Sequence, residues 1–168
     1  MKLNKFLGFI ALPFLAVTIV AQEVEEVVIT GSYIKSSPTD GASPVEIIGR
    51  DEIDNLNATT IADITANIAV NSGSENNSDS FTQGSTQGTS NINLRGLGLS
   101  STLVLVDGKR HTLAANTAND GSVFVNTSSI PVIALDRVEV LKEGAASIYG
   151  SDAVAGVVNY ILRKDFTG

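Results

Sequence analysis

Side chains that could carry out catalysis are few in this chain, and they are not spaced as a catalytic site. The single histidine, His111, follows a predicted tight turn and stands beside two basic residues, as at a solvated hairpin end. There is no cysteine to serve as a nucleophile, and no G-x-S-x-G sequence that would present a serine. Gly108-Lys109 fails the phosphate-loop pattern, because Arg110 follows it and Leu103 stands where that pattern needs a glycine. We therefore expect no enzyme activity.

Metal and cofactor binding is not predicted either. A zinc site needs several histidine or cysteine ligands, which this composition does not supply. The tripeptide Asn119-Asp120-Gly121 is typical of a turn and lacks the spaced oxygen ligands of a calcium loop. We expect no metal and no cofactor. A secreted hydrolase stays open only as a third hypothesis, because Asp and Glu are abundant.

A short apolar segment near the N-terminus could bind a partner through its backbone. It consists of Glu26, Val27, Val28, Ile29 and Thr30. A β-prone segment in a polar tail can add itself as an edge strand to a partner's sheet, with backbone hydrogen bonds giving affinity and alternate side chains giving specificity. The alternative is an N-terminal strand of this chain's own sheet. Gly31 and the Ser/Pro-rich stretch after it separate the segment from the folded part, which favours partner binding.

Several further motifs follow one another in a fixed order. Asn93-Leu94-Arg95-Gly96 precedes Leu103-Val104-Leu105-Val106-Asp107-Gly108. The run from Leu135 to Gly144 continues into Ala145–Gly150 and then Ala153–Asn159. This order closely resembles the plug domain of TonB-dependent outer-membrane receptors, and Glu25–Gly31 is similar to the TonB box of that family. The resemblance implies a plug that fills a membrane barrel, and it names the C-terminal domain of TonB as the partner of residues 26–30.

The resemblance also implies contacts between the plug and its own barrel. In the family, plug arginines pair with carboxylates of the barrel, and the matching residues of this chain are Arg95, Arg137, Glu139 and Lys142. The chain has Lys142-Glu143-Gly144 where many relatives have Arg-Gly-Pro, which keeps the positive charge but loses the bidentate fork of arginine. The alternative for Arg95, Arg137 and Lys142 is an ordinary surface or intradomain ion pair.

Two polar loops are the candidates for ligand contact. Residues 71–91 are almost entirely Asn, Ser, Gly, Thr and Gln, and residues 113–126 hold a second Asn- and Thr-rich stretch. Long loops inside compact domains are commonly functional or disordered, so a flexible insertion without contacts is the alternative for the first loop. The resemblance implies that both loops touch a small extracellular nutrient. The candidate contact residues are Asn77, Phe81, Gln83, Asn116 and Asn119.

The first 21 residues predict export. Lys2 and Lys5 precede an apolar run from Phe6 to Val20, and Ala21 supplies a small residue for cleavage. A membrane anchor is the alternative, but a spanning helix needs about 20 apolar residues.

The formal net charge of −7 becomes more negative without the two lysines, which argues against nucleic-acid binding. Export without cysteine means a fold held without disulfides.

The rest of the chain is predicted to be a mobile tail, residues 22–43, followed by a plug domain, residues 44–168. Strands are expected at residues 45–48, 91–94, 103–106, 137–141 and 156–162. Asp51 is expected to cap one helical turn, and Thr60 a second helix with Asp63 in a capping-box position and Ile61, Ile64 and Ile68 on one face. Short helical turns are also expected from residue 129 and at 145–149. The predicted fold class is α+β, with a small mixed sheet of about four strands, short helices and long polar loops.

Two functions from different classes remain. The first is the N-terminal part of an outer-membrane receptor, with its plug inside the barrel and its TonB box facing the periplasm. The second is a stand-alone periplasmic module that resembles a plug and transports nothing, which applies if the chain truly ends at Gly168. The length is too small for an additional large barrel, whose strands need about 10 residues each. The reading frame after Gly168 distinguishes the two.

Overall fold

The computed structural model describes residues 45–75, 84, 86–143 and 145–164. The predicted leader, the segment 26–30 and three candidate loop residues, Asn77, Phe81 and Gln83, lie outside them. No helix in the described part is long and apolar enough to cross a membrane.

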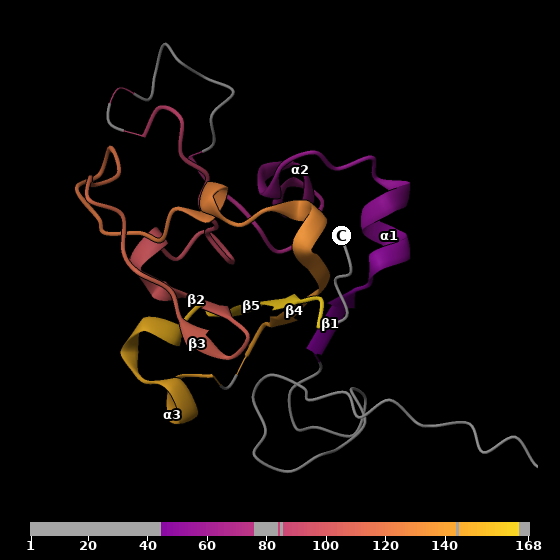
Figure 1. The fold of residues 1–168 in the computed structure, drawn as a ribbon. Coiled ribbons are helices and arrows are strands. Elements are labelled where there is room, and N and C mark those ends of the chain that lie inside the picture. The colour runs from indigo at the N-terminus through magenta and orange to yellow at the C-terminus, as the bar shows by residue number, and fades with distance from the viewer. Residues whose placement is uncertain (1–44, 76–83, 85, 144, 165–168) are drawn as a thin grey trace, which may run out of the picture.

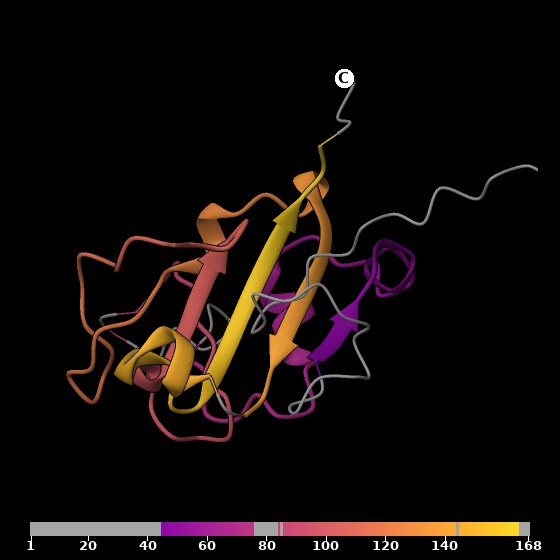
Figure 2. The ribbon, with the colours of Figure 1, turned by 90° about the horizontal axis from the view of Figure 1, so that it is seen from below.

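Five strands of the described residues form one mixed sheet in the order β1-β4-β5-β2-β3. They are β1 (Val45–Ile48), β2 (Thr102–Val106), β3 (Lys109–Arg110), β4 (Leu135–Leu141) and β5 (Gly156–Leu162). The central strand β5 pairs antiparallel with β4 and parallel with β2, while β1 and β3 form the two edges. Figure 2 shows the sheet with β5 between β4 and β2. The α+β class is confirmed.

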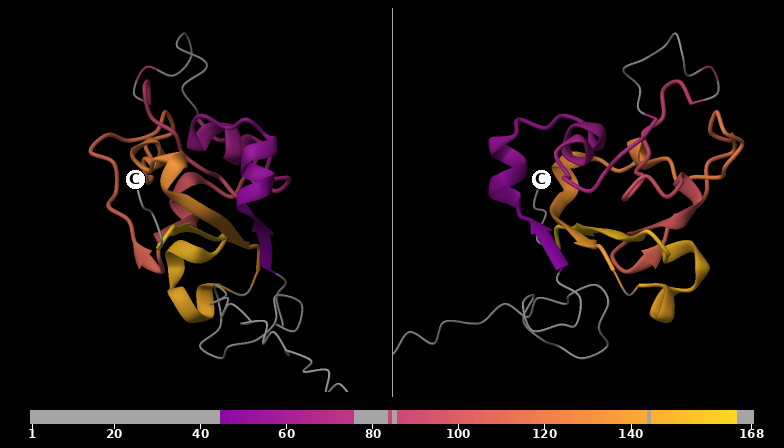
Figure 3. Two further views of the ribbon diagram at one scale, coloured as in Figure 1. Left: turned by 45° about the vertical axis from the view of Figure 1, so that its right-hand side comes forward. Right: turned by 180° about the vertical axis from the view of Figure 1, so that it is seen from behind.

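In the described part of the chain, three α-helices and four short 3-10 helices surround the sheet. The α-helices are α1 (Arg50–Asn55), α2 (Ile61–Ala66) and α3 (Ala146–Tyr149). The 3-10 helices are η1 (Leu99–Ser101), η2 (Thr127–Ser129), η3 (Val132–Ala134) and η4 (Ser151–Ala153). Figures 1 and 3 show α1 and α2 on one side of the sheet and α3 on the opposite side.

The main core lies between the sheet and the pair α1 and α2. Period-two alternation brings one set of strand side chains to this face, in register across the sheet: Ile48 opposite Val138, and Val138 opposite Tyr160. Ile61, Ile64 and Ile68 are buried against them, as their helical spacing predicted. A second, smaller cluster covers the other face, where Leu103, Leu105, Leu141 and Val157 meet Ala145 and Ala153 near α3.

The turn and cap predictions have mixed outcomes. Asp107 and Gly108 both have positive φ, +48° and +74°, as a two-residue hairpin between β2 and β3 requires. The capping box of α2 is confirmed, since the Asp63 N–H donates to Thr60 Oγ1 and the Thr60 N–H donates to Asp63 Oδ2. The predicted cap of α1 is wrong. Gly49 holds the extended N-cap position and Asp51 lies inside the first turn, where its charge suits the helix dipole.

One other expectation is corrected. Residues 91–94 form no strand, and only an isolated bridge joins Asn71 to Leu94. The short helix expected to open at Ser129-Ile130-Pro131 is the 3-10 helix η3, which begins directly after Pro131. The fifth strand, β3, has two residues and was missed because such a short segment shows no alternation.

Gly156 at the start of β5 is a position that only glycine fits. Its φ is +140°, and a Cβ atom there would lie 2.5 Å from the Leu141 carbonyl oxygen and 2.7 Å from Leu94 Cδ1. The central strand can therefore approach β4 and residue 94 closely only because no side chain intervenes.

Candidate functional site

The two polar loops are joined to each other by hydrogen bonds at two levels. Near the tip of the second loop, the Asn119 N–H donates to both carboxylate oxygens of Glu75, at 3.2 and 3.3 Å. Toward the bases, the Thr127 N–H and its Oγ1 donate to the Ser90 carbonyl oxygen at 2.8 and 3.0 Å. The Ser90 N–H donates in return to Asn126 Oδ1 at 3.1 Å. The described parts of the loops are therefore one unit, which lies on the same side of the sheet as α1 and α2 in Figure 1.

The second loop also has internal structure. The Ala114 N–H donates to the Phe124 carbonyl at 2.8 Å, and the Ala118 N–H donates to the Ser122 carbonyl at 2.9 Å. Phe124, Ala118 and Leu99 are buried together in a small apolar cluster beneath it. Of the two candidate ligand residues in this loop, Asn119 is exposed and Asn116 is half-buried.

Asp120 at the tip of this loop is held by a local turn. Its Oδ1 accepts hydrogen bonds from the Ser122 N–H at 2.8 Å and from Ser122 Oγ at 2.6 Å. These bonds, with the side-chain bond the larger cause, lower the pKa of the Asp120 carboxyl below its usual value. The side chain is therefore ionised at neutral pH.

Side chains replace the expected strand ladder at residues 91–94. The Asn93 N–H donates to Asn71 Oδ1 at 3.0 Å, and the Leu94 N–H donates to Thr102 Oγ1 at 3.0 Å. Asn93 Oδ1 in turn accepts from the Gly98 N–H at 3.0 Å. Asparagine and threonine satisfy buried backbone groups here without a neighbouring strand, which explains why polar and apolar alternation predicted the wrong element.

The four predicted barrel-contact residues do not form one cluster. Arg95 has a positive φ of +57°, and its guanidinium donates to two backbone carbonyls, Ala155 O at 3.2 Å and Val154 O at 2.9 Å. Within the described part of the chain, no carboxylate lies within ion-pair distance of Arg95. The other three residues belong to β4 or follow it directly.

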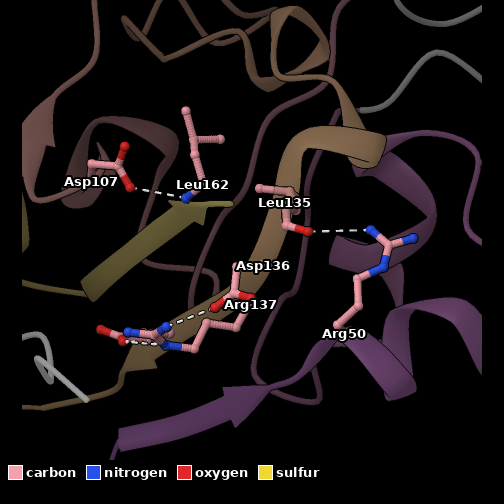
Figure 4. A network of polar contacts seen from close by, with 7 residues as sticks. Arg50, Asp107, Leu135, Asp136, Arg137 and Leu162 are labelled. Carbon is pink, nitrogen blue, oxygen red and sulfur yellow. Dashed lines mark hydrogen bonds and ion pairs between the residues drawn. The ribbon is translucent and has the colours of Figure 1, made fainter. Parts of the chain in front are cut away.

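Arg137, Glu139 and Lys142 have carboxylate or cation partners inside the domain. Arg137 Nε lies 2.9 Å from Glu139 Oε1, and its Nη1 lies 2.8 Å from Asp136 Oδ2. Figure 4 shows the contact between Arg137 and Asp136. Glu139 is fully buried on β4, the strand between β1 and β5. Lys142 Nζ lies 2.8 Å from Glu46 Oε2 and so connects the end of β4 to the edge strand β1. The alternative of an intradomain ion pair describes Arg137 and Lys142 within this chain.

Other polar contacts were not found from the sequence. Arg50 at the start of α1 pairs with Asp54 and donates to the carbonyls of Val132 and Leu135 at 3.0 and 3.3 Å. Figure 4 shows the bond to Leu135. The i, i+4 spacing of Arg50 and Asp54 could have indicated the first contact but not the other two. Asp107 Oδ1 accepts from the Leu162 N–H at 2.9 Å, which closes the end of the hairpin on β5.

The structure also shows where the side chains that could be reactive or bind a metal lie. His111 follows β3, is half-buried, and has its Nδ1 3.2 Å from the Thr112 carbonyl oxygen. Among the described residues, no group of three His, Cys, Asp or Glu side chains is arranged to hold a metal ion.

Comparisons with known proteins agree on one family. Residues 37–157 match the family described as TonB-dependent Receptor Plug Domain. The chain is 35% identical over 142 residues to the vitamin B12 transporter BtuB of Vibrio vulnificus, covering 83% of this chain and 21% of that protein. It is 41% identical over 78 residues to an iron-regulated outer membrane virulence protein of Vibrio cholerae, covering 46% of this chain and 12% of that protein.

Solved structures give the same result for the fold. A mutant of the ferric enterobactin receptor from Pseudomonas aeruginosa superimposes with a TM-score of 0.57 at 27% identity, covering 77% of this chain and 19% of that chain. The ferric citrate transporter FecA in its unliganded form superimposes with a TM-score of 0.56 at 27% identity, covering 73% and 18%. The present chain thus spans about a fifth of these proteins or less.

Proposed function

Because the chain belongs to the TonB-dependent receptor plug family, we propose that it closes the barrel of an outer-membrane transporter and couples ligand binding to TonB-driven uptake of a small nutrient. The observation that carries this proposal is the joining of the two polar loops into one unit through Glu75, Ser90 and Thr127. A joined pair of loops offers one preformed ligand face, whereas two independent insertions would each lose conformational entropy on binding.

The N-terminal side of the domain suits the TonB-binding role of residues 26–30. The tail enters the described domain at Val45, the first residue of the edge strand β1. That strand is hydrogen-bonded only to β4 within the described sheet. A partner that captures Glu26 to Thr30 by strand addition would therefore act on the domain through an edge and not through its centre.

The contacts inside the domain distinguish which of the predicted residues is best able to bind the barrel. Arg137 and Lys142 already face Glu139, Asp136 and Glu46, so a barrel carboxylate would compete with these partners. Arg95 instead uses its guanidinium on neutral carbonyls and keeps its full positive charge available. We assign the main barrel contact to Arg95.

The proposed organisation follows from these assignments. Residues 1–21 are a leader, residues 22–43 carry the TonB box and a linker, and residues 44–168 form the plug. The protein is exported and acts in the outer membrane, with the ligand loops toward the outside and the box toward the periplasm. The family is one of transporters and receptors, and we propose no enzymatic role.

The TonB contact is tested with Val28→Pro in the exported chain. Proline removes a backbone donor from the segment, so strand addition to the TonB C-terminal domain should weaken by about tenfold or more. Titration calorimetry measures the affinity. Ser37→Pro, which lies outside the segment, is the matched control and should bind as the unaltered chain does. Equal affinity for Val28→Pro and the unaltered chain would contradict the role of residues 26–30.

A further inference from the structure

The central strand β5 extends beyond its parallel neighbour β2. Strand β2 ends at Val106, which lies opposite Tyr160, whereas β5 continues to Leu162. The Asp107 N–H still donates to the Tyr160 carbonyl oxygen at 3.0 Å. In a parallel ladder, a residue that donates to one carbonyl also accepts, with its own carbonyl, from the N–H two residues further along the partner strand. A straight continuation of β2 would therefore bind the Leu162 N–H through the backbone carbonyl of Asp107.

The side chain of Asp107 takes the place of that backbone carbonyl. The chain turns into the hairpin at Asp107, where φ is +48°. Asp107 Oδ1 accepts the hydrogen bond from the Leu162 N–H at 2.9 Å, as Figure 4 shows. Asp and Asn tolerate positive φ better than other residues with a side chain, and both carry an acceptor oxygen close to the backbone. The residue type at position 107 thus permits the turn and also supplies the acceptor.

The other side of β5 is held up to the same point. Leu162 lies opposite Leu135 of β4, and the Arg163 N–H donates to the Ala134 carbonyl of η3 at 2.8 Å. Arg50 of α1 donates in turn to the Leu135 carbonyl at 3.3 Å. The last residues of β5 are therefore bonded to the hairpin on one side and to η3 and β4 on the other.

The chain enters the described domain at a place with fewer contacts. Val45 lies opposite Leu141, at the other end of β4 from Leu135, about 20 Å away at roughly 3.3 Å per residue. Within the described sheet, β1 pairs only with β4. The ion pair between Glu46 and Lys142 joins partly exposed side chains and adds little. The entrance is an edge strand, whereas the exit is a central strand held on both sides.

We propose that Asp107 is a positioning residue that fixes the direction in which the chain leaves the plug, so that the exit at Arg163 is a rigid joint and not a hinge. Under the proposed function, the segment that follows leads to the barrel, and the meaning of the joint for transport rests on that function. A pull that enters at Val45 then loads the edge strand β1, while the exit keeps its orientation relative to the sheet.

The orientation of the exit can be measured with two spin labels. The chain has no cysteine, so Ala66→Cys at the end of α2 and Lys164→Cys after the exit give two exposed labelling sites. Double electron–electron resonance on the exported chain gives the distribution of distances between the labels. We expect a narrow distribution with Asp107 or Asp107→Asn, and a clearly broader one with Asp107→Gly or Asp107→Ala.

The choice of variants separates the acceptor from the backbone. Asn keeps an acceptor oxygen and tolerates positive φ. Gly and Ala both lack the acceptor, but Gly relaxes the backbone at φ +48° whereas Ala is strained there. Broadening shared by Gly and Ala therefore identifies the lost acceptor as the cause. Broadening in the Gly variant alone, or equal widths in all four proteins, would overturn the inference.

Amide hydrogen exchange tests the same bond directly. In Asp107→Gly and Asp107→Ala, the Leu162 amide should exchange about tenfold faster relative to the Val158 amide in the middle of β5, the factor expected for one ordinary hydrogen bond. Asp107→Asn should restore slow exchange at Leu162. Equal acceleration at Leu162 and Val158 would report a loss of global stability and would contradict a positioning role.

These measurements use the chain itself, so they do not depend on transport. A failure of the proposed function would appear as unchanged TonB affinity in Val28→Pro, with the label distances and exchange rates still as expected. A failure of the present inference would appear as a Leu162 amide and a Lys164 label that are insensitive to residue 107, with TonB binding unaffected.

Discussion

In the sheet, the side chains that face α1 and α2 are apolar and interdigitate, whereas the described parts of the two polar loops are joined to each other by hydrogen bonds of Asn, Ser and Thr. Burial is non-directional, so the sheet depends on volume and close approach. The loop pair depends on individual donors and acceptors with defined geometry. The sheet is therefore a rigid support, whereas the shape of the loop pair is set by a few polar contacts.

The largest loss of stability is expected from a substitution at Gly156, where the sheet leaves no space for a side chain. Gly156→Ala places a Cβ atom 2.5 Å from the Leu141 carbonyl oxygen at a φ of +140°. The backbone must shift, so the free energy of unfolding should fall by at least about 3 kcal/mol, and the variant can fail to fold. Urea denaturation measures the loss. Gly84→Ala, which has open space and no positive φ, should change stability by about 0.5 kcal/mol or less.

Removing volume from the same core should have the next largest effect. Ile64 of α2 is fully buried, and Ile64→Ala should lower the free energy of unfolding by about 2 to 5 kcal/mol through lost transfer energy and a cavity. Leu97→Ala is the control, because Leu97 is 52% exposed. A similar loss for both variants in denaturant titrations would contradict the placement of α2 over the sheet.

In the loop pair, a single hydroxyl should have a smaller effect than a core side chain but still a measurable one. Thr127→Val preserves shape but removes the Oγ1 donor from the buried contact with Ser90. We expect a loss of about 1 to 3 kcal/mol and faster amide hydrogen exchange at residues 86–91. Thr117→Val, at an exposed threonine, should leave both unchanged.

The smallest effect is expected at the capping box of α2 and depends on pH. Hydrogen bonds from Thr60, with the backbone bond the largest cause, lower the pKa of the Asp63 carboxyl. A lowered pKa contributes stability above the unfolded value of about 3.9, and this contribution is lost as the pH falls through the folded value. The stability difference between the unaltered chain and Asp63→Asn should therefore shrink between pH 7 and pH 3. A constant difference across that range in urea titrations would contradict the capping role.

Sequence patterns predicted the parts of the fold that repeat with a fixed period. The buried face of α2 was found from its helical spacing, and β2 was found because Leu103 to Val106 is a continuous apolar run followed by a turn signal. Strands β1, β4 and β5 were also predicted. The capping box was found because it is a local pair of residue types. Residues 91–94 were misassigned because side chains of Asn71 and Thr102 take the place of a neighbouring strand, and such long-range contacts have no local signal.

The candidate site, too, was predicted from the sequence only in part. The motif around Arg95 and Arg137 was recognised, but the sequence could not show that Arg137 is paired with Glu139 while Arg95 rests on carbonyls. Nor could it show that Glu75 and Asn119, which are 44 residues apart, join the two loops. These contacts depend on how the sheet brings distant segments together.

The central claim, that this domain closes a barrel, is tested most directly with Arg95→Ala in the full-length receptor. If Arg95 meets barrel carboxylates in a desolvated contact, its removal should destabilise the seating by about 3 to 5 kcal/mol, against about 0 to 1 kcal/mol for a surface pair. Cells that carry the variant should become sensitive to large antibiotics that normally do not cross the outer membrane, while Arg110→Ala, whose partner Asp152 lies within the domain, should leave resistance intact. Unchanged resistance and uptake for Arg95→Ala, at normal receptor levels, would contradict the account.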